Sequence, residues 1–359
     1  MKKTKIIKIN PDRVNLGKIR QAANILKEGG LVAYPTDTVY GLAANYYNRK
    51  AVRRLYEIKK RPKNKPFPIQ VESVEKIKEF NIIISEDARI LIDKYWPGPL
   101  TLILETKNKQ KFGFRIPANE IAKSLLKETD TPLCVPSANY SGEDPVKDAK
   151  DVIINFDGII EAIIDGRSCS GGIESTVIDL TSKPYRLLRE GTISLEELKN
   201  SLKGKDTFVK VKNILFVCTG NSCRSVMAKG LLEKEKKSSS NLNIISAGTM
   251  AFSGVPPTKE TIAVMTNEGI DVSNNKSRGV LPSLVNKANL ILVMEPKHKQ
   301  FLIERYPKIE DKVFLLKEYK NKQDIKDPVI KDPIGESMSV YKEVFNEIKK
   351  EIERIKDIL

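Results

Sequence analysis

The sequence is poor in cysteine, histidine and long apolar runs, and each shortage excludes a class of protein. Its four cysteines show none of the spacing of a disulfide framework, which indicates the reducing cytoplasm. No stretch approaches the ~18 apolar residues that cross a membrane. The basic start at residues 1–8 is followed by neither the apolar core nor the small-residue cleavage site of a signal peptide. We therefore expect a cytoplasmic protein without a membrane partner.

Positive charge predominates, because Lys and Arg number 62 against 46 Asp and Glu. The excess divides evenly, with 8 charges in residues 1–200 and 8 in residues 201–359, so there is no basic tail. Such a charge favours anionic partners, among them ATP, phosphate groups and RNA, although a lysine-rich solvated surface explains most of it. The single histidine, His298, follows a helix start and is most simply a surface residue without a chemical role.

The length of 359 residues favours two domains of roughly 150–200 residues each. There is no internal repeat and no long low-complexity tract. A short polar stretch near residues 203–207 separates a helical pattern from an apolar run. We expect one domain at residues 1–203, a linker at 204–212 and a second domain at 213–359.

A motif in the second half indicates nucleophilic chemistry. An apolar run ending at Cys218 predicts a buried strand, and a helical pattern follows Arg224. A cysteine between a strand and a helix N-terminus lies where loop N–H groups and the helix dipole stabilise a thiolate and a bound anion. Arg224 supplies a planar fork for two phosphoryl oxygens, while Gly220 and Asn221 tolerate the positive φ of a tight loop. The motif predicts phosphoryl transfer through Cys218, with a structural thiol as the alternative.

The loop lacks the Gly-Lys-Ser/Thr ending of a nucleotide-binding P-loop, which argues against nucleotide hydrolysis there. A phosphocysteine enzyme also needs an acid for the leaving group and then a base for water. Asp332, on a loop shaped by proline and glycine before the last helical pattern, suits that role. Asp327 is also followed by proline, and the sequence does not exclude it.

Residues 213–359 resemble the low-molecular-weight protein phosphatases. The matching segments, in the right order, are Cys218-Thr-Gly-Asn-Ser-Cys-Arg-Ser225, Ser246-Ala-Gly248, Asn275-Lys-Ser-Arg278 and Asp332-Pro333. The resemblance implies that the catalytic residues are Cys218, Arg224, Asp332 and Ser225, with Ser225 hydrogen-bonded to the cysteine sulfur. It also implies that Cys223 can trap an oxidised Cys218 as a disulfide. The phosphate-binding residues would be Thr219, Gly220, Asn221, Ser222 and Cys223.

Strand and helix patterns alternate through this second half. Strands are expected at residues 214–217, 243–246, 290–294 and 313–315, and helices at 225–237, 259–268, 296–306 and 337–358. This alternation predicts a doubly wound parallel sheet with its site at the carboxyl ends of the strands.

The first half sets polar residues into apolar strands that glycine and proline interrupt. A strand expected at 30–34 leads to a Thr-Asp-Thr turn, and a helix expected at 51–60 ends in a cation-rich turn. Together the polar positions indicate an anionic ligand, although each residue alone has an ordinary structural role. The candidate binding residues are Thr36, Thr38, Lys59, Arg61, Lys65, Arg115, Ser137, Asn139, Ser175 and Arg189.

Residues 8–200 closely resemble the threonylcarbamoyl-AMP synthase (YrdC-like) family. The resemblance lies in Pro-Thr-Asp-Thr-Val-Tyr-Gly-Leu at 35–42, Lys-Lys-Arg-Pro at 59–62 and Pro-Ser-Ala-Asn at 136–139. It implies a twisted mixed α/β domain that converts L-threonine, bicarbonate and ATP into threonylcarbamoyl-AMP and pyrophosphate, for threonylcarbamoyladenosine in tRNA. Mg²⁺ would arrive with ATP rather than in a dedicated protein site. Other tRNA-modification proteins would take up the product, and the basic surface offers tRNA a contact.

The resemblance also assigns roles. Lys59, Arg61 and Lys65 would contact the triphosphate and carboxylate groups, while Thr36 and Thr38 would line the threonine and bicarbonate pocket. The nucleotide site would be completed by Ser137, Asn139, Ser175 and Arg189, with Arg115 as a further anion contact. The long members of this family end in a different domain, so the role of that domain, including lid closure, does not carry over to this chain.

The phosphatase family divides mainly into tyrosine and arginine phosphatases. Tyrosine-specific members usually have an apolar residue at the position of Ser222 and aromatic residues after the Asp-Pro. Here Ser222 can hydrogen-bond a guanidinium, and Ile334 and Gly335 offer no ring for a phenol, so we expect a protein phosphoarginine preference. Two alternatives remain: a first half that binds RNA without catalysis, and a phosphatase half that is an inactive scaffold.

Overall fold

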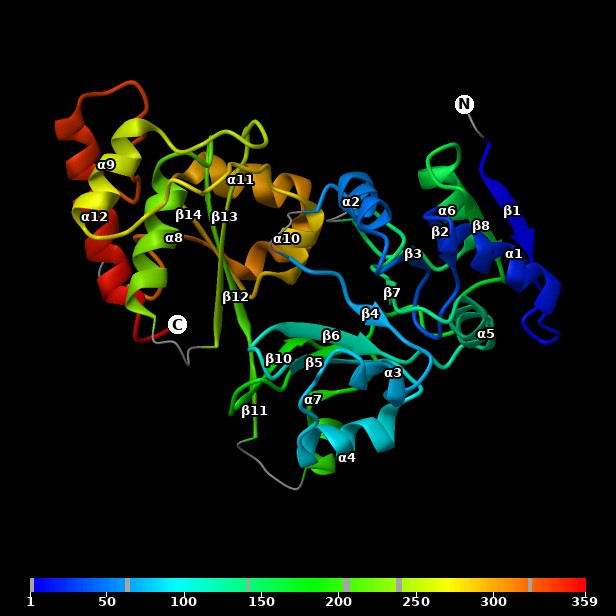
Figure 1. Ribbon diagram of the computed structural model, residues 1–359. Helices are drawn as coiled ribbons and strands as arrows, with labels where there is room; N and C mark the ends of the chain where they lie inside the picture. Colours follow the sequence, from blue (N-terminus) through cyan, green and yellow to red (C-terminus); the bar gives the residue numbers. More distant parts are fainter. Residues whose placement is uncertain (1–2, 62–64, 141–142, 203–206, 237–240, 322–324) are drawn as a thin grey trace. The chain divides into compact units, whose positions relative to one another are not determined.

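The computed structural model describes residues 3–61, 65–140, 143–202, 207–236, 241–321 and 325–359. The chain divides into two compact units, Met1–Lys210 and Val211–Leu359. Each unit combines a sheet with helices that lie between its strands along the chain (Figure 1). No helix among these residues is long and apolar enough to span a bilayer.

The first unit is built on a mixed sheet. In spatial order its strands are β1 (Lys5–Lys8), β8 (Ala162–Asp165), β2 (Val32–Tyr34), β3 (Gly41–Asn45), β7 (Leu133–Cys134), β4 (Ile69–Gln70), β6 (Lys111–Arg115), β5 (Leu100–Glu105), β9 (Thr176–Asp179), β10 (Tyr185–Arg189) and β11 (Phe208–Lys210). Its helices are α1 (Leu16–Lys27), α2 (Arg49–Ile58), α3 (Val74–Lys78), α4 (Glu86–Tyr95), α5 (Glu120–Thr129), α6 (Ala149–Phe156) and α7 (Leu195–Ser201). The mixed α/β fold predicted for this half is confirmed.

Alternate residues of β2 enter different cores, because successive side chains of a strand point to opposite faces. Val32 and Tyr34 pack with buried residues of α1 and α5. Ala33 packs with buried residues of α2 and α6. Helices therefore cover both faces of this part of the sheet.

The strands β5 and β6 alternate in the same way, with a different outcome. Leu102 and Phe114 are buried in a core that they share with α4 and α7. Thr101, Ile103 and Arg115, on the opposite face, line a cavity. The period-two pattern of these strands therefore builds a core on one face and a ligand-sized space on the other.

The second unit has a sheet in which all neighbouring strands are parallel. In spatial order the strands are β13 (Leu242–Gly248), β12 (Lys212–Cys218), β14 (Leu290–Val293) and β15 (Val313–Leu315). The helical segments are α8 (Arg224–Glu235), α9 (Lys259–Asn267), α10 (Pro282–Lys287), α11 (Pro296–Arg305), η1 (Pro307–Lys312) and α12 (Met338–Ile355). The predicted doubly wound parallel sheet is confirmed, with each of its four expected strands present.

The two faces of β12 pack against different helices. Ile214, Phe216 and Cys218 lie in a core with buried residues of α8, α9 and α12. Leu215 and Val217 lie in a core with buried residues of α10 and α11. Cys218 is thus the last residue of a strand that is buried on both faces, which fixes the position of its thiol.

Residues 204–212, expected as a linker, contain regular structure in their described part. β11 pairs with β10 in parallel, with Phe208 opposite Tyr185. Phe208 and Tyr185 are both buried in the core beneath α4 and α7. An aromatic anchor therefore ties this stretch to the first unit, and β12 begins at Lys212, only two residues after β11 ends.

Candidate functional sites

The first unit contains a cavity of about 490 Å³ against one face of its sheet. Five cations and two carboxylates are among the described residues that line it: Arg61, Lys65, Lys111, Arg115, Arg189, Glu174 and Asp179. Hydroxyl groups of Thr36, Thr38, Thr101 and Ser137 also line it. The excess of positive charge and the polar lining suit a polyanionic ligand with additional hydrogen-bonding groups.

The structure brings most of the predicted binding residues to this one cavity. Those that line it are Thr36, Thr38, Arg61, Lys65, Arg115, Ser137 and Arg189. The other three lie directly behind the lining. Lys59 is only 2% exposed, and its Nζ donates to the Ser137 carbonyl at 2.6 Å and to Asn139 Oδ1 at 3.2 Å. Ser175 Oγ accepts from Arg189 Nη2 at 3.0 Å.

A chain of hydrogen bonds orders the threonine hydroxyls. Thr36 Oγ1 donates to the Val39 carbonyl at 2.6 Å, and this bond uses its single proton. The 3.0 Å contact between the two hydroxyls is therefore donated by Thr38. Thr38 Oγ1 in turn accepts from Arg115 Nη1 at 2.8 Å. The arginine and the Thr-Asp-Thr turn are thus held as one rigid group at the cavity wall.

Arg115 is buried and largely engaged by the protein. Its Nη2 lies 2.7 Å from Asp37 Oδ1, and its Nε donates to the Gly98 carbonyl at 3.0 Å. Burial lowers the pKa of the Arg115 guanidinium, and Asp37 opposes that shift. Asp37 Oδ2 is buried without a hydrogen-bond partner among the described residues. The Arg115–Asp37 pair therefore leaves one carboxylate oxygen unsatisfied beside the cavity wall.

Arg61 and Arg189 approach the cavity from different elements. Arg61 Nε donates to the Lys65 carbonyl at 2.8 Å, and its guanidinium lies 5.3 Å from the centre of the Phe67 ring. Arg189 Nη1 pairs with Glu174 Oε1 at 2.6 Å. Burial lowers the pKa of Arg61, and the positive charge of Arg189 adds to this effect. Two like charges held close together indicate a site that gains stability when an anion binds between them.

In the second unit, Cys218 ends β12 and its sulfur meets two donors. The backbone N–H of Asn221 donates to Sγ at 3.3 Å, and Ser225 Oγ lies 3.0 Å from Sγ. The amide of Asn221 donates to the same hydroxyl at 2.9 Å, so the proton of Ser225 is directed at the sulfur. Together with the N-terminus of α8, these donors stabilise a thiolate.

The loop that follows Cys218 has one residue in the left-handed region. Asn221 has φ 54° and its Oδ1 accepts from the backbone N–H of Arg278 at 3.0 Å. Gly220, for which the sequence suggested the same freedom, does not adopt a positive φ. A Cβ at Gly220 would instead lie 3.3 Å from Ser222 Oγ, so the glycine provides space rather than an unusual backbone conformation.

Arg224 is 1% exposed and its guanidinium is held from several sides. Nη1 lies 2.6 Å from Glu295 Oε1 and donates to the Ile330 carbonyl at 2.9 Å. Nη2 pairs with Asp332 Oδ2. Burial raises the pKa of the Glu295 carboxyl, but hydrogen bonds from Arg224 and Lys297 outweigh it and the net shift is downward. A charged Glu295 therefore fixes the guanidinium beside the thiol loop.

The two aspartates that competed as general acid occupy different places. Asp332 is half-buried and contacts Arg224, which places it at the thiol loop. Asp327 is exposed, and its Oδ1 accepts from the backbone N–H of Val329 at 3.0 Å within its own loop. Of the two, only Asp332 has a contact with the candidate site among the described residues.

His298 is not a surface residue, so that expectation is wrong. It is 1% exposed, and its Nε2 lies 2.9 Å from Thr219 Oγ1. Burial, with a contribution from the Arg224 charge, lowers its pKa to about 4. α11 begins at Pro296, and its first turn directs the imidazole inward, although polarity alone suggested an exposed position.

Two groups border the loop without a predicted role. Cys223 is buried, with Sγ 3.6 Å from both Ser222 Oγ and Thr258 Oγ1. The backbone N–H of Met250 donates to the Thr219 carbonyl at 3.0 Å, which holds the segment after β13 against the loop. Phe252, on that segment, is 84% exposed. An exposed ring therefore lies on a segment next to the thiol loop, which the sequence did not suggest.

Comparisons with known proteins agree with the first half of this description. Residues 24–191 match the family model described as Telomere recombination (Sua5_yciO_yrdC). The threonylcarbamoyl-AMP synthase of Pyrococcus abyssi is 43% identical over 197 residues, which are 52% of this chain and 58% of that protein. A relative from Methanocaldococcus jannaschii is 34% identical over 207 residues, which are 55% of this chain and 97% of the relative. The chain belongs to the threonylcarbamoyl-AMP synthase family.

The chain spans between 53% and 58% of the length of the first three curated synthases that it matches. Among solved structures, the P. abyssi protein Sua5 in complex with L-threonine matches 79% of this chain and 95% of that chain. Its sequence identity is 30% and its TM-score is 0.54. The synthase family therefore accounts for the first unit and leaves the second to be explained.

Residues 213–358 match the family model described as Low molecular weight phosphotyrosine protein phosphatase. An arginine phosphatase structure from Geobacillus stearothermophilus has 33% identity over 41% of this chain and 92% of that chain, with a TM-score of 0.38. A low-molecular-weight tyrosine phosphatase from T. tengcongensis has 34% identity over 41% of this chain and 99% of that chain, with a TM-score of 0.39. This member of the synthase family therefore has a phosphatase-family domain as its second unit.

Proposed function

We propose that the chain is a bifunctional enzyme that makes L-threonylcarbamoyl-AMP in its first unit and dephosphorylates protein in its second. The first reaction joins a carbamate oxygen, formed from L-threonine and bicarbonate, to the α-phosphorus of ATP. The bond between the α-phosphorus and the bridging oxygen breaks, and pyrophosphate leaves. The observation that supports this most is the convergence of Arg61, Arg115 and Arg189 with a threonine hydroxyl chain at one cavity.

The residues of the cavity fit the charge changes of such a transfer. Negative charge moves from the carbamate to the leaving pyrophosphate, so an enzyme mainly has to position anions and neutralise charge. Arg61, Lys65 and Arg189 would contact phosphate groups, and Thr38 would hydrogen-bond the threonine or bicarbonate group. Lys59 would act from behind, by holding the 137–139 turn that lines the cavity. Mg²⁺ would enter as part of the ATP substrate.

The second unit would act through a phosphocysteine intermediate. The Cys218 thiolate attacks phosphorus, the bond to the leaving group breaks, and Asp332 gives the leaving group a proton. Asp332 then removes a proton from the water that cleaves the sulfur–phosphorus bond. A bound phosphoryl group would compete with Asp332 for Arg224 Nη2, so substrate binding would release Asp332 for its role as acid.

We propose phosphoarginine in a protein as the preferred substrate. Ser222 is half-exposed at the thiol loop, where its hydroxyl can accept from a guanidinium N–H of the substrate. Ile334 is 58% exposed beyond Asp332 and offers a phenol no ring to stack on. The exposed Phe252 is compatible with either substrate, because a ring stacks on a phenol and on a guanidinium alike.

The specificity is tested by comparing kcat/KM on phosphoarginine and phosphotyrosine peptides of the same sequence. We expect a preference for phosphoarginine in the wild type, and a shift toward phosphotyrosine in Ser222→Ile. Phe252→Ala serves as the matched control at the other side of the loop. A clear phosphotyrosine preference in the wild type would contradict the proposed substrate while leaving the phosphocysteine chemistry intact.

The physiological setting extends this proposal. Threonylcarbamoyl-AMP would serve the threonylcarbamoyladenosine modification of tRNA, and other modification proteins would receive it in the cytoplasm. The first reaction is distinguished from simple RNA binding by pyrophosphate release that depends on both L-threonine and bicarbonate. The second is distinguished from an inactive scaffold by loss of turnover in Cys218→Ser.

A further inference from the structure

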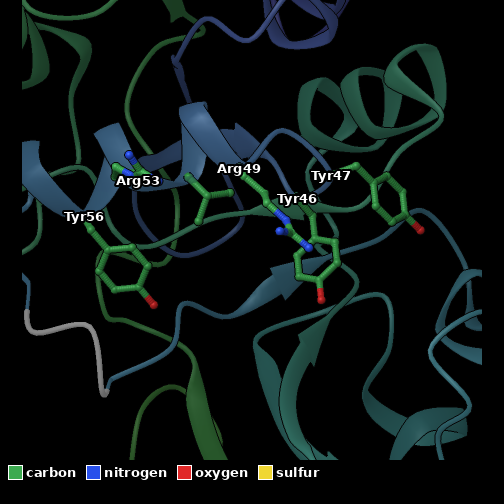
Figure 2. A pocket seen from close by; sticks show the side chains of 6 residues that line it. Tyr46, Tyr47, Arg49, Arg53 and Tyr56 are labelled. Carbon is green, nitrogen blue, oxygen red and sulfur yellow. The ribbon is translucent and has the colours of Figure 1, made fainter.

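A second cavity lies in the first unit, with lining residues that do not belong to the ATP cavity. Its volume is about 600 Å³, and it is lined by Tyr46, Tyr47, Arg49, Val52, Arg53 and Tyr56 (Figure 2). These residues come from α2 and from the segment just before it. Neither of the proposed reactions uses them, so the cavity is unexplained by those activities.

The spacing of the residues places them along one side of a helix. Arg49, Val52 or Arg53, and Tyr56 follow at intervals of three or four residues, which lie on one face of an α-helix. In Figure 2 the rings of Tyr46 and Tyr56 lie along the same side of α2, and the Arg49 side chain extends toward Tyr46. The helix start is fixed, because the Asn48 side chain accepts from the backbone N–H groups of Lys50 and Ala51.

The tyrosine rings are held in place by other rings. Tyr46 packs against Phe80 with ring centres 5.1 Å apart, and against Tyr47 at 5.4 Å. Tyr56 packs against Phe67 with ring centres 4.1 Å apart. Tyr47 is nevertheless 57% exposed. The surface therefore offers aromatic faces whose conformational entropy has already been lost, which favours stacking of a flat ligand.

The charge of this surface is positive and largely uncompensated. α2 contains Arg49, Lys50, Arg53 and Arg54 but only one acid, Glu57. Arg54 is neutralised by Glu161 at 2.8 Å, whereas Arg49 and Arg53 are exposed and have no ion pair among the described residues. The other nearby carboxylate, Glu79, interacts with Tyr47 and is itself paired with Lys76 at 3.3 Å.

We propose that the α2 surface, made of Tyr46, Tyr47, Arg49, Arg53 and Tyr56, binds a single-stranded segment of nucleic acid. Unstacked bases would lie on the tyrosine rings, and the arginines would contact backbone phosphates. Arg49 and Arg53 are one helical turn apart, about 6 Å along the axis. That distance is close to two nucleotide steps of a stacked strand, at roughly 3.4 Å each.

Other ligands fit the surface less well. A membrane surface would require exposed apolar side chains, but the one aliphatic residue of the cavity, Val52, is half-buried. An acidic peptide would satisfy the arginines and leave the tyrosine rings without a partner. The proposal goes beyond the synthase and phosphatase activities and does not depend on either, because none of the five residues lines the ATP cavity or the thiol site.

The test uses the full-length protein and labelled oligonucleotides of mixed sequence, about 12 nucleotides long, in a fluorescence-anisotropy titration at several salt concentrations. The probes are single-stranded RNA, single-stranded DNA and an RNA duplex. Two charge-matched variants are compared: Arg49→Glu/Arg53→Glu on α2, and Arg13→Glu/Lys27→Glu at exposed positions at either end of α1. A third variant, Tyr47→Ala, removes the exposed ring. Thermal melting and both enzymatic activities verify that each variant is folded.

We expect the single strands to bind more tightly than the duplex, and the relative affinity for RNA and DNA identifies the natural source. Arg49→Glu/Arg53→Glu should weaken binding at least tenfold more than the control, and should reduce the slope of log K against log salt by about 1.4 for two lost phosphate contacts. Tyr47→Ala should weaken binding roughly five- to hundredfold without changing that slope.

Several results would overturn the proposal. Equal weakening by the α1 and α2 charge reversals would show that net charge alone attracts the strand. Tighter binding of the duplex would exclude stacking on the tyrosines. Binding of a poly-glutamate peptide, with no binding of the oligonucleotides, would assign the surface to an acidic protein partner.

Discussion

The imidazole Nε2 of His298 lies 2.9 Å from the Oγ1 of Thr219, the residue directly after the candidate nucleophile. The other ring nitrogen, Nδ1, is buried without a partner among the described residues. A neutral ring with its proton on Nε2 leaves only an acceptor unsatisfied, which costs less than an unsatisfied N–H. His298 therefore donates to Thr219, and the Thr219 hydroxyl proton is left for the phosphate site.

This relationship predicts that His298 positions the loop without touching the substrate. His298→Leu should lower phosphatase kcat/KM about fivefold, which corresponds to one hydrogen bond of roughly 1 kcal/mol. His298→Gln, whose amide can donate in the same direction, should recover most of the loss. Steady-state kinetics of the three proteins is the measurement, and equal activity of the leucine variant and the wild type would refute the positioning role.

The depressed pKa of His298 also predicts acid sensitivity of the second unit. Its pKa is about 4 in the folded protein and about 6.5 when unfolded, so the unfolded chain binds the proton more readily between these values. Stability should therefore be full above pH 6.5 and fall as the pH drops toward 4, by on the order of 3 kcal/mol.

Hydrogen exchange of peptides from α11 between pH 7 and 4.5, corrected for intrinsic rates, measures this loss. The His298→Gln variant is the control, because it has no group that titrates at this position. If wild type and variant lose protection in parallel as the pH falls, His298 is not the group responsible.

The choice between the two aspartates gives a third prediction. Asp332→Asn should reduce phosphatase kcat by roughly 10²–10⁴-fold, the usual worth of a general acid and base. Asp327→Asn should stay near the wild type, because its side chain serves only its own loop. A leaving group of low pKa should rescue Asp332→Asn in the first step. A larger loss in Asp327→Asn would reverse the assignment.

Lys59 and Arg61 should separate stability from substrate binding in the first unit. Lys59 is buried and donates to the 137–139 turn, so Lys59→Ala should destabilise the unit by about 3 kcal/mol as well as remove activity. Arg61 donates to two carbonyls near the cavity, so Arg61→Ala should mainly raise KM for ATP. Unfolding followed by Trp96, the single tryptophan, reports on the first unit alone. Equal destabilisation by both variants would contradict this division.

The parts of the fold and sites that the sequence predicts well are those that local pattern decides. β12, its loop and α8 are contiguous, so one stretch of sequence displays the apolar strand, the thiol and the arginine together. The four parallel strands of the second unit also follow from alternation. The general acid needed the structure, because the approach of Asp332 to Arg224 joins residues that are 108 positions apart.

The residues that the sequence missed depend on register and tertiary packing. Lys111, Glu174 and Asp179 line the ATP cavity only because of how separate segments pair and turn. Charged residues at alternate positions of otherwise apolar strands are the signal that could have found Lys111 and Asp179. His298 was misassigned because the burial of one helix face cannot be decided from a polar sequence such as Pro296–Arg305. The anchor at Phe208 was missed for the same reason.

The most direct test of the central claim is pyrophosphate release from ATP by the full-length protein, with and without L-threonine and bicarbonate. Cys218→Ser controls for the second activity, and Arg61→Ala for the ATP cavity. Release that requires both co-substrates, persists in Cys218→Ser and falls in Arg61→Ala is the predicted result. No release from a folded protein whose phosphatase turnover is intact would contradict the account, and would leave the first unit as a binding module attached to a phosphatase.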